Sequence, residues 1–416
     1  MSKALSFIER HYPIFIIGLS AAFLFYKYAL QVSPGIMSDD LMQAFHINGA
    51  QLGNLAAMYF YGYLVVQVFA GPLLDKFGVR RVTPIAILMC AFGALFFSQS
   101  LFFGSALLSR MLIGMGTSFA TVSYLKCGAD HFKPQQFAFV SGLLGTAIML
   151  GAVFGEAPLV FVLHHIGWRK MLFDVSLLGF LIAVIFFIIA RDHQVIPHHP
   201  TAEKFSLNNL IAILKSRQNW LLTIYSGCAF SPIAVLGGLW GNPFLCVAYP
   251  ISLEQASFLL SWIFIGFGVG GPILGLIADK TDTHSLLMKI TAIISSVSLA
   301  ILIYDQHLSL WMVGFFMFVI GLCSASILLA FVLARNLNTV LMVGTVVAMV
   351  NTGGDIIGAV TQPIAGKFLD LHWHGTLVNG ARHYSLSDYH HAFMILPIYL
   401  IFAWVSLLFV EDSKLS

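Results

Sequence analysis

Residues 50–81 read AQLGNLAAMYFYGYLVVQVFAGPLLDKFGVRR, and residues 254–285 repeat the pattern as EQASFLLSWIFIGFGVGGPILGLIADKTDTHS. The two stretches align without a gap at an offset of 204 residues. The identical pairs that anchor the alignment are Gln51–Gln255, Gly62–Gly266, Gly71–Gly275, Asp75–Asp279 and Lys76–Lys280. A repeat of this spacing in a chain of 416 residues predicts two homologous halves.

The composition places most of the surface in lipid. Hydrophobic residues make up 59% of the chain, charged residues only 9%, and the mean hydropathy is +0.89. A soluble protein has roughly a quarter of its residues charged. The net charge of +3 arises without a long basic run, so we expect no nucleic-acid partner. The five cysteines form no CxxC pair, and we interpret them as small buried hydrophobic residues.

Apolar runs near the length of about 20 residues that crosses a bilayer recur along the whole chain. They lie at 13–34, 51–74, 82–101, 105–126, 137–160, 168–190, 219–245, 256–278, 286–304, 309–333, 340–366 and 389–410. The sequence therefore predicts an all-α membrane protein with twelve transmembrane helices in two pseudo-symmetric six-helix bundles. The predicted parts are an N-terminal bundle (1–190), a linker (191–218) and a C-terminal bundle (219–416).

Lysine and arginine residues orient these spans. With the N-terminus inside, fifteen of them fall in cytoplasmic segments and four on the opposite side. Positive residues accumulate on the cytoplasmic side of membrane proteins. We therefore expect both termini in the cytoplasm. Within the linker, Leu207–Leu214 alternates apolar and polar residues beside Lys215, which predicts a short helix on the inner leaflet.

The loop after the second span carries a recognisable motif. GPLLDKFGVRR, residues 71–81, resembles the loop 2–3 motif of the major facilitator superfamily, and RMLIGMG at 110–116 is similar to its span-four motif. The resemblance covers essentially the whole chain and implies the major facilitator fold, a pair of six-helix bundles that work by alternating access. The gating residues it implies are Gly71, Asp75, Lys76, Arg80 and Arg81, with a second copy at Gly275, Asp279 and Lys280.

The chemistry of this motif suits a gate. Gly71 would let two helices approach closely. Asp75, at a helix end, can accept hydrogen bonds from a neighbouring helix terminus and from a lysine or arginine. Span five carries Gly142, Gly151 and Gly155, spaced like the glycines of an antiporter motif. That motif continues with Gly-Pro, whereas here Glu156 follows Gly155, which argues against drug/proton antiport.

Three further stretches narrow the resemblance. LQVSPGIM (30–37), GGLWGNPFL (237–245), and RNLN (335–338) leading to NTGG (351–354) are similar to the phagosomal nutrient transporters of intracellular bacterial pathogens. Members of that group take up amino acids or nucleosides. The resemblance implies an importer in a bacterial inner membrane, most simply coupled to protons.

A charge inside a predicted span is costly and needs a partner or a function, and four charged residues are candidates for a function. They are Lys27, Arg110, Glu156 and Asp355. Lys27 and Arg110 together can hold a substrate carboxylate, with arginine the better bidentate partner. Glu156 or Asp355 can take up and release the coupling proton. A purely structural ion pair, such as Arg110–Glu156, would also explain two of these charges.

Uncharged polar residues complete the predicted substrate site. Gln31 lies one turn after Lys27, and Thr117, Thr121 and Tyr124 share a face of span four at helical spacing. Asn351 lies one turn before Asp355. Further candidates are Trp240 and Asn242 in span seven, although aromatic residues at helix ends often belong to the interfacial belt. Tyr59 and Tyr63 can stack on a base or simply pack.

We expect a monomeric secondary transporter of a small molecule. An enzyme is not expected, because the sequence has no GxSxG, P-loop or metal-spaced cluster within the spans, and we expect no cofactor or metal. The favoured substrate is an amino acid or another carboxylate-bearing nutrient, with a nucleoside as a second candidate. Export or import of a siderophore or organic anion, and proton-driven drug efflux, are competing hypotheses.

Overall fold

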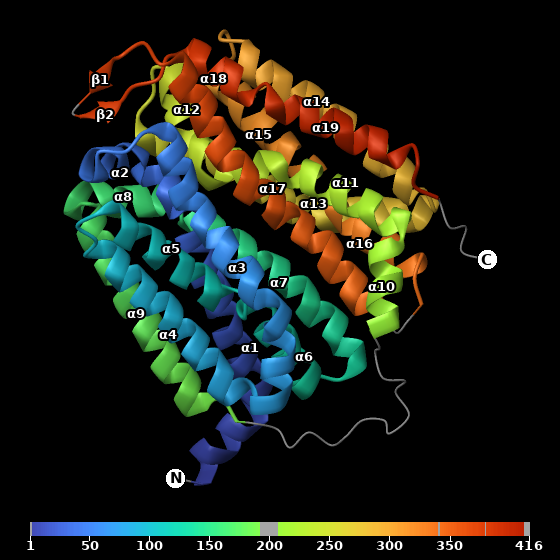
Figure 1. Cartoon of the computed structure of the whole chain (residues 1–416). Helices are drawn as coiled ribbons and strands as arrows, with labels where there is room; N and C mark the ends of the chain where they lie inside the picture. Colours follow the sequence, from blue (N-terminus) through green and yellow to red (C-terminus); the bar gives the residue numbers. More distant parts are fainter. Residues whose placement is uncertain (1, 192–206, 340–341, 379, 412–416) are drawn as a thin grey trace. The chain divides into compact units, whose positions relative to one another are not determined.

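The computed structural model is almost entirely helical (Figure 1) and describes the chain except residues 1, 192–206, 340–341, 379 and 412–416. The described residues also form a small antiparallel hairpin, in which β1 (Leu377–Val378) pairs with β2 (Ala381–Arg382). Gly380 between the strands has a φ of 84°, a conformation open to glycine at no steric cost.

Half of the predicted spans are single long helices. They are α3 (Gly49–Phe77), α4 (Val79–Ser98), α9 (Trp168–Ile189), α13 (Leu253–Thr281), α14 (His284–Tyr304) and α17 (Val343–His372). A shorter helix, α10 (Leu207–Lys215), occupies the stretch where a linker helix is predicted. Its location on a membrane surface stays a prediction.

The other six spans are interrupted. The first is α1 (Ser2–Val32), followed by the 3-10 helix η1 (Ser33–Met37) and α2 (Ser38–Phe45). The fourth and fifth are α5 (Phe103–Thr117) with α6 (Ala120–His131), and α7 (Pro134–Phe154) with α8 (Ala157–Ile166). The seventh is α11 (Arg217–Pro232), the π-helix η2 (Ile233–Trp240) and α12 (Gly241–Ala248). The tenth and twelfth are α15 (Leu310–Ser324) with α16 (Ile327–Asn336), and α18 (Leu386–Phe393) with α19 (Ile395–Leu407).

These helices confirm the predicted membrane fold. Among the described residues, eleven helical stretches are long and apolar enough to cross a bilayer. The remaining predicted span, 105–126, is also helical, as α5 and α6. Arg110, Lys126 and several hydroxyl residues make this pair more polar than the others.

Packing divides the chain into two compact units. Unit 1 contains residues 1–37 and 58–196, and unit 2 contains residues 38–57 and 197–416. In unit 1, α4 packs against α5 and α9, and α1 against α6 and α7. In unit 2, α13 packs against α15, α11 against α17 and α19, and α14 against α19. Residues 38–57 thus pack with unit 2, although the repeat places them in the first half of the sequence.

Glycines bring helices into backbone contact at corresponding places in the two units. In unit 1, a Cβ added at Gly62 would clash with the Met111 carbonyl, and one at Gly114 with the Tyr59 carbonyl. In unit 2, Gly266 meets the carbonyl of Phe318 in the same way, and Gly321 that of Ile263. Each pair of helices therefore crosses through a surface that only glycine can form.

Candidate functional site

Lys27 is a buried cation in unit 1. Its residue is 3% exposed, and its Nζ lies 4.8 Å from the centroid of the Tyr28 ring and 4.6 Å from that of Tyr63. The negative faces of aromatic rings attract a cation, most strongly when it is removed from water. The α1 helix and the unit 1 part of α3 thus hold an ammonium group at a defined place inside a membrane-spanning bundle.

Arg110 of α5 binds the end of α1. Its Nη1 donates to the Leu30 carbonyl at 2.8 Å and its Nη2 to the Gln31 carbonyl at 3.5 Å. The sequence explains why the first carbonyl is available: in a regular helix it would accept from the amide of residue 34, which is Pro34 and has no N–H. Arg110 is 1% exposed, so these bonds are made away from water.

These contacts connect Arg110 to the end of α1. Both terminal nitrogens of its guanidinium face backbone carbonyls, and its central carbon lies 5.3 Å from the centroid of the Tyr59 ring. The geometry therefore makes Arg110 a residue that positions the Lys27-bearing helix end. Direct contact of Arg110 with a solute stays a prediction.

Two tyrosines join Lys27 and Gln31 into one group of side chains. The Tyr59 hydroxyl donates to Oε1 of Gln31 at 3.1 Å, and the Tyr59 and Tyr63 rings stack with centroids 6.3 Å apart. The Tyr63 ring in turn carries Lys27. The structure thus brings the predicted residues Lys27, Gln31 and Arg110 together with the two tyrosines, and these five residues form the Lys27 cluster.

Glu156 lies in the break between α7 and α8 and is fully buried. Beside it, a Cβ added at Gly155 would meet Val32 and Ala29 of α1, and one at Gly151 would meet the Phe25 backbone. Span five therefore passes α1 at backbone distance, along the part of α1 that carries Lys27. This contact places the Glu156 backbone next to the end of α1.

The predicted polar face of span four is not continuous, because the helix breaks between Thr117 and Ala120. The Thr117 hydroxyl donates to the Gly114 carbonyl of its own helix at 2.9 Å. The Tyr124 hydroxyl donates to the Val140 carbonyl at 2.7 Å and so connects α6 to α7. Thr121 is half-buried. The i, i+4, i+7 spacing assumed one unbroken helix, whereas the structure has two, α5 and α6, and a shared substrate-binding face stays a prediction.

In unit 2, Trp240 and Asn242 are completely buried. The Trp240 indole donates to the Gln362 carbonyl at 3.2 Å, and the Ser257 hydroxyl donates to Oδ1 of Asn242 at 3.1 Å. The Gln362 side chain donates to the Ala234 carbonyl within η2 at 2.8 Å. Sequence reasoning missed Gln362, and a glutamine before Pro363 in an apolar helix was the available signal.

Asn351 and Asp355 lie one turn apart on α17, as predicted from their spacing. Asn351 is exposed, whereas Asp355 is half-buried and has one carboxylate oxygen covered. Both residues belong to unit 2, whereas the Lys27 cluster belongs to unit 1.

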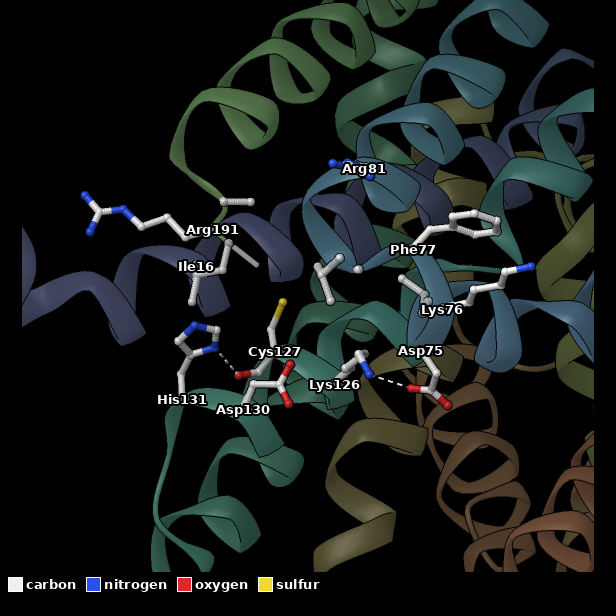
Figure 2. Close-up of a pocket in the computed structure, with 14 residues that line it drawn as sticks. Ile16, Asp75, Lys76, Phe77, Arg81, Lys126, Cys127, Asp130, His131 and Arg191 are labelled. Atoms are coloured by element: carbon white, nitrogen blue, oxygen red, sulfur yellow. Dashed lines mark hydrogen bonds and ion pairs between the residues drawn. The ribbon is translucent and has the colours of Figure 1, made fainter. Parts of the chain in front are cut away.

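The loop motif forms an ion pair in unit 1. Nζ of Lys126 lies 2.5 Å from Oδ1 of Asp75, and Figure 2 shows the two side chains pointing toward each other. They border a cavity of about 240 Å³ that Asp130 and His131 also line. In the second copy, Asp279 faces His284, with 3.7 Å between Oδ1 and Nε2.

The other motif residues lie around these acids. Arg80 packs 5.6 Å from the Phe187 ring, Lys76 packs against Phe77, and Arg81 lines the cavity. Lys280 follows Asp279 directly and is exposed. The expected close helix approach at Gly71 is not found: in the described part of the chain, a Cβ at Gly71 or Gly275 would meet no atom within 4 Å. Gly62 and Gly266 make that approach instead.

Comparison with known proteins gives a consistent family. The profile described as Major Facilitator Superfamily matches residues 14–244. The chain is similar to the hexuronate transporter of Bacillus subtilis, at 22% identity over 66% of this chain and 67% of that protein. It is also similar to the lysosomal dipeptide transporter MFSD1 of Danio rerio, at 23% identity over 83% and 78%. The match to the uncharacterized transporter YybO of Bacillus subtilis spans 48% of this chain and 45% of that protein, at 24% identity.

Solved structures show the same fold. A bacterial homolog of the human lysosomal transporter Spinster, in an inward-facing and occupied conformation, superposes with a TM-score of 0.80. It is 14% identical, and the match covers 97% of this chain and 98% of that chain. The nucleoside transporter NupG superposes with a TM-score of 0.75 at 14% identity, over 94% and 99%.

Proposed function

We propose that this chain, which belongs to the Major Facilitator Superfamily and is a membrane transporter rather than an enzyme, imports a small carboxylate-bearing solute together with protons. The sequence resemblance indicates amino acids or nucleosides as solutes. An amino acid carries a carboxylate and fits this proposal, whereas a nucleoside carries none and fits it less well. The observation that carries the proposal is the buried ammonium of Lys27.

A buried cation in a membrane protein is costly, so its presence indicates a function. The rings of Tyr28 and Tyr63 lie 4.8 and 4.6 Å from the Lys27 ammonium and attract its positive charge. A solute carboxylate would add a charge-assisted hydrogen bond, which is stronger than a neutral one. Arg110 supports this role by fixing the end of α1 through the Leu30 and Gln31 carbonyls.

The names of several relatives agree with an anionic solute. The hexuronate transporter of Bacillus subtilis and the probable L-galactonate transporter of Escherichia coli carry sugar acids by name, at 22% and 21% identity. MFSD1 carries dipeptides by name, and these also end in a carboxylate. A solute with one carboxylate and a compact polar body would satisfy Lys27, Gln31 and Tyr59 together.

For proton coupling we propose Glu156 in unit 1 and Asp355 in unit 2. Glu156 lies at a helix break beside α1, where a change of its charge would act on the helix that carries Lys27. Asp355 lies one turn from Asn351 on α17. The proposed orientation, with both termini in the cytoplasm, places the Asp75–Lys126 pair on the inner side as part of a gate.

The test is uptake into proteoliposomes of purified protein, with hexuronates, amino acids, dipeptides and nucleosides as candidate solutes. Uptake of an acid should require an inward proton gradient. Lys27→Met should reduce it to below about a tenth, the loss of about 1.4 kcal/mol of binding, while Lys27→Arg retains part of it. Uptake that survives both Lys27→Met and collapse of the gradient would contradict the proposal.

Drug efflux is the second candidate, because the multidrug resistance protein 2 of Bacillus subtilis is 25% identical over 50% of this chain. Against it, Glu156 interrupts the Gly-Pro sequence with which the antiporter motif continues. The same proteoliposomes separate the two: an exporter would accumulate a lipophilic cation under the opposite gradient, and Lys27→Met would leave that transport intact.

A further inference from the structure

The carboxylate of Asp370, at the end of α17 in unit 2, is surrounded by donors. Its Oδ1 accepts hydrogen bonds from the Gly49 amide at 3.0 Å, Arg382 at 3.0 Å and the Tyr384 hydroxyl at 2.7 Å. Its Oδ2 accepts from the Ala50 amide at 2.8 Å. Asp370 thus caps the N-terminus of α3, where unpaired amides and the helix dipole favour a negative charge.

Two glycine contacts hold the same helix end against α17. A Cβ added at Gly366 would clash with the Gly49 backbone, and one at Gly53 would clash with the backbone of Gln362 and Pro363. In addition, α2 packs against β2 of the hairpin. Residues 38–57 are therefore attached to unit 2 by one charged cap and by backbone contacts that tolerate no side chain.

The attached segment is directly connected to unit 1. After Ala57, the same α3 helix continues into unit 1, which carries Lys27. A transporter that works by alternating access must rearrange the contacts between its repeats during each cycle. We infer that Asp370, with Gly49, Ala50, Arg382 and Tyr384, forms a latch that holds residues 38–57 on unit 2 and releases them when the solute path opens on the predicted outer side.

The latch is suited to reversible release. The side chains of Asp370 and Arg382 are 14% and 29% exposed, so water can replace their bonds when the helix end departs. Arg382 also rests on the Trp373 ring at 4.2 Å, which keeps its guanidinium in place. Burial, together with the nearby Asp370 charge, raises the pKa of Tyr384, so its hydroxyl stays protonated and can donate.

The chain contains its own reporter for this movement. Cys246 in α12 is half-buried, whereas the other four cysteines are buried. The Cys246 thiol lies within electrostatic range of Asp39 of α2 and so is near the latched segment. Departure of residues 38–57 should therefore expose Cys246 to a water-soluble maleimide.

The experiment measures the rate of Cys246 labelling in the full-length protein in nanodiscs, with Cys246→Ser as the background. Asp370→Asn keeps the shape but removes the charge, and Gly366→Val forces the helices apart. Both should raise the labelling rate at least about threefold by shifting the population toward the released form. Lys367→Gln changes an exposed charge on the same helix and should leave the rate unchanged.

Equal labelling of Asp370→Asn, Gly366→Val and the unaltered protein would overturn the latch. If Asp370→Asn does not fold, Arg382→Gln retains the helix cap and should give a smaller increase, and no increase there would also contradict it. The inference does not depend on which solute is carried. The Cys246 labelling rate tests the latch, and solute uptake tests the proposed function. Either proposal can therefore fail without the other.

Discussion

The α3–α5 crossing in unit 1 and the α13–α15 crossing in unit 2 have the same backbone and different chemistry. In both, a glycine on each helix lies against a carbonyl of the other, at Gly62 and Gly114 in the first and Gly266 and Gly321 in the second. The helix breaks also correspond, because α5 and α15 each end three residues after the second glycine of their crossing. The repeat therefore preserves the scaffold.

The two crossings differ in the residue that precedes the carbonyl contacted by Gly62 or by Gly266. Arg110 precedes Met111 in unit 1, and the buried Met317 precedes Phe318 in unit 2. Likewise Tyr59, which bonds Gln31, corresponds to the apolar Ile263. Packing is thus common to both crossings, whereas the cation and the polar network belong to unit 1. The two copies therefore share a backbone frame and differ in the side chains that it carries.

The largest expected effect comes from breaking the frame itself. Gly114→Leu and Gly321→Leu each drive a side chain into a backbone carbonyl, Tyr59 in one unit and Ile263 in the other. Overpacking costs about 1–3 kcal/mol even where side chains can shift, and backbone is less yielding. Both variants should lose several degrees in apparent melting temperature in detergent, or fail to accumulate.

The matched controls are Gly71→Leu and Gly275→Leu, where an added Cβ meets no atom of the described residues within 4 Å. These should melt within about a degree of the parent, because surface changes rarely exceed about 0.5 kcal/mol. If only one of Gly114→Leu and Gly321→Leu lowers the melting temperature, the two crossings do not contribute equally to stability.

A smaller effect on stability is expected when Arg110 of the first crossing is replaced by methionine, the residue at the corresponding position of the second. Arg110→Met removes the donors to the Leu30 and Gln31 carbonyls. A hydrogen bond to a charged group is worth about 1.5–3 kcal/mol, although removal of a buried charge offsets part of this loss. We expect a modest fall in melting temperature and a loss of uptake of at least about tenfold, because the end of α1 is no longer fixed.

The control for that variant is Arg110→Lys, which keeps the charge but lacks the planar fork and should recover only part of the uptake. Full uptake by Arg110→Met would show that Arg110 neither binds the solute nor positions α1. A large loss of stability with normal turnover per folded molecule would assign it to folding alone.

The fold was predictable because hydropathy and the repeat act over long stretches. About 20 apolar residues cross a bilayer whatever their order, so the predicted spans coincide with helices even where Pro34 or the Thr117–Ala120 break interrupts one. The attachment of residues 38–57 to unit 2 was not predictable in this way. It depends on Asp370, which lies 321 residues after Gly49 in the sequence.

The charged residues of the candidate site could be predicted from the sequence, but their contacts could not. Lys27 and Arg110 were identifiable because a charge inside a span is rare. Pro34 lacks the amide that would bond the Leu30 carbonyl in a regular helix, and Arg110 of another helix donates to that carbonyl. The Trp240–Gln362 hydrogen bond joins two different helices, and the residue pattern within either helix does not predict it.

The smallest expected effect compares Asp75 and Asp279, the two copies of the proposed gating acid. Asp75 pairs with Lys126 at 2.5 Å, whereas Asp279 faces a histidine at 3.7 Å. Both aspartates are about three-quarters exposed, at 74% and 76%, and exposed ion pairs are worth about 0–1 kcal/mol. Asp75→Asn should therefore leave the melting temperature almost unchanged but alter the transport rate, and Asp279→Asn should alter it less. Measuring both rates at low and high salt checks the cause, because salt screens exposed charges. If Asp279→Asn slows transport as much as Asp75→Asn, the asymmetry between the copies does not extend to the gate.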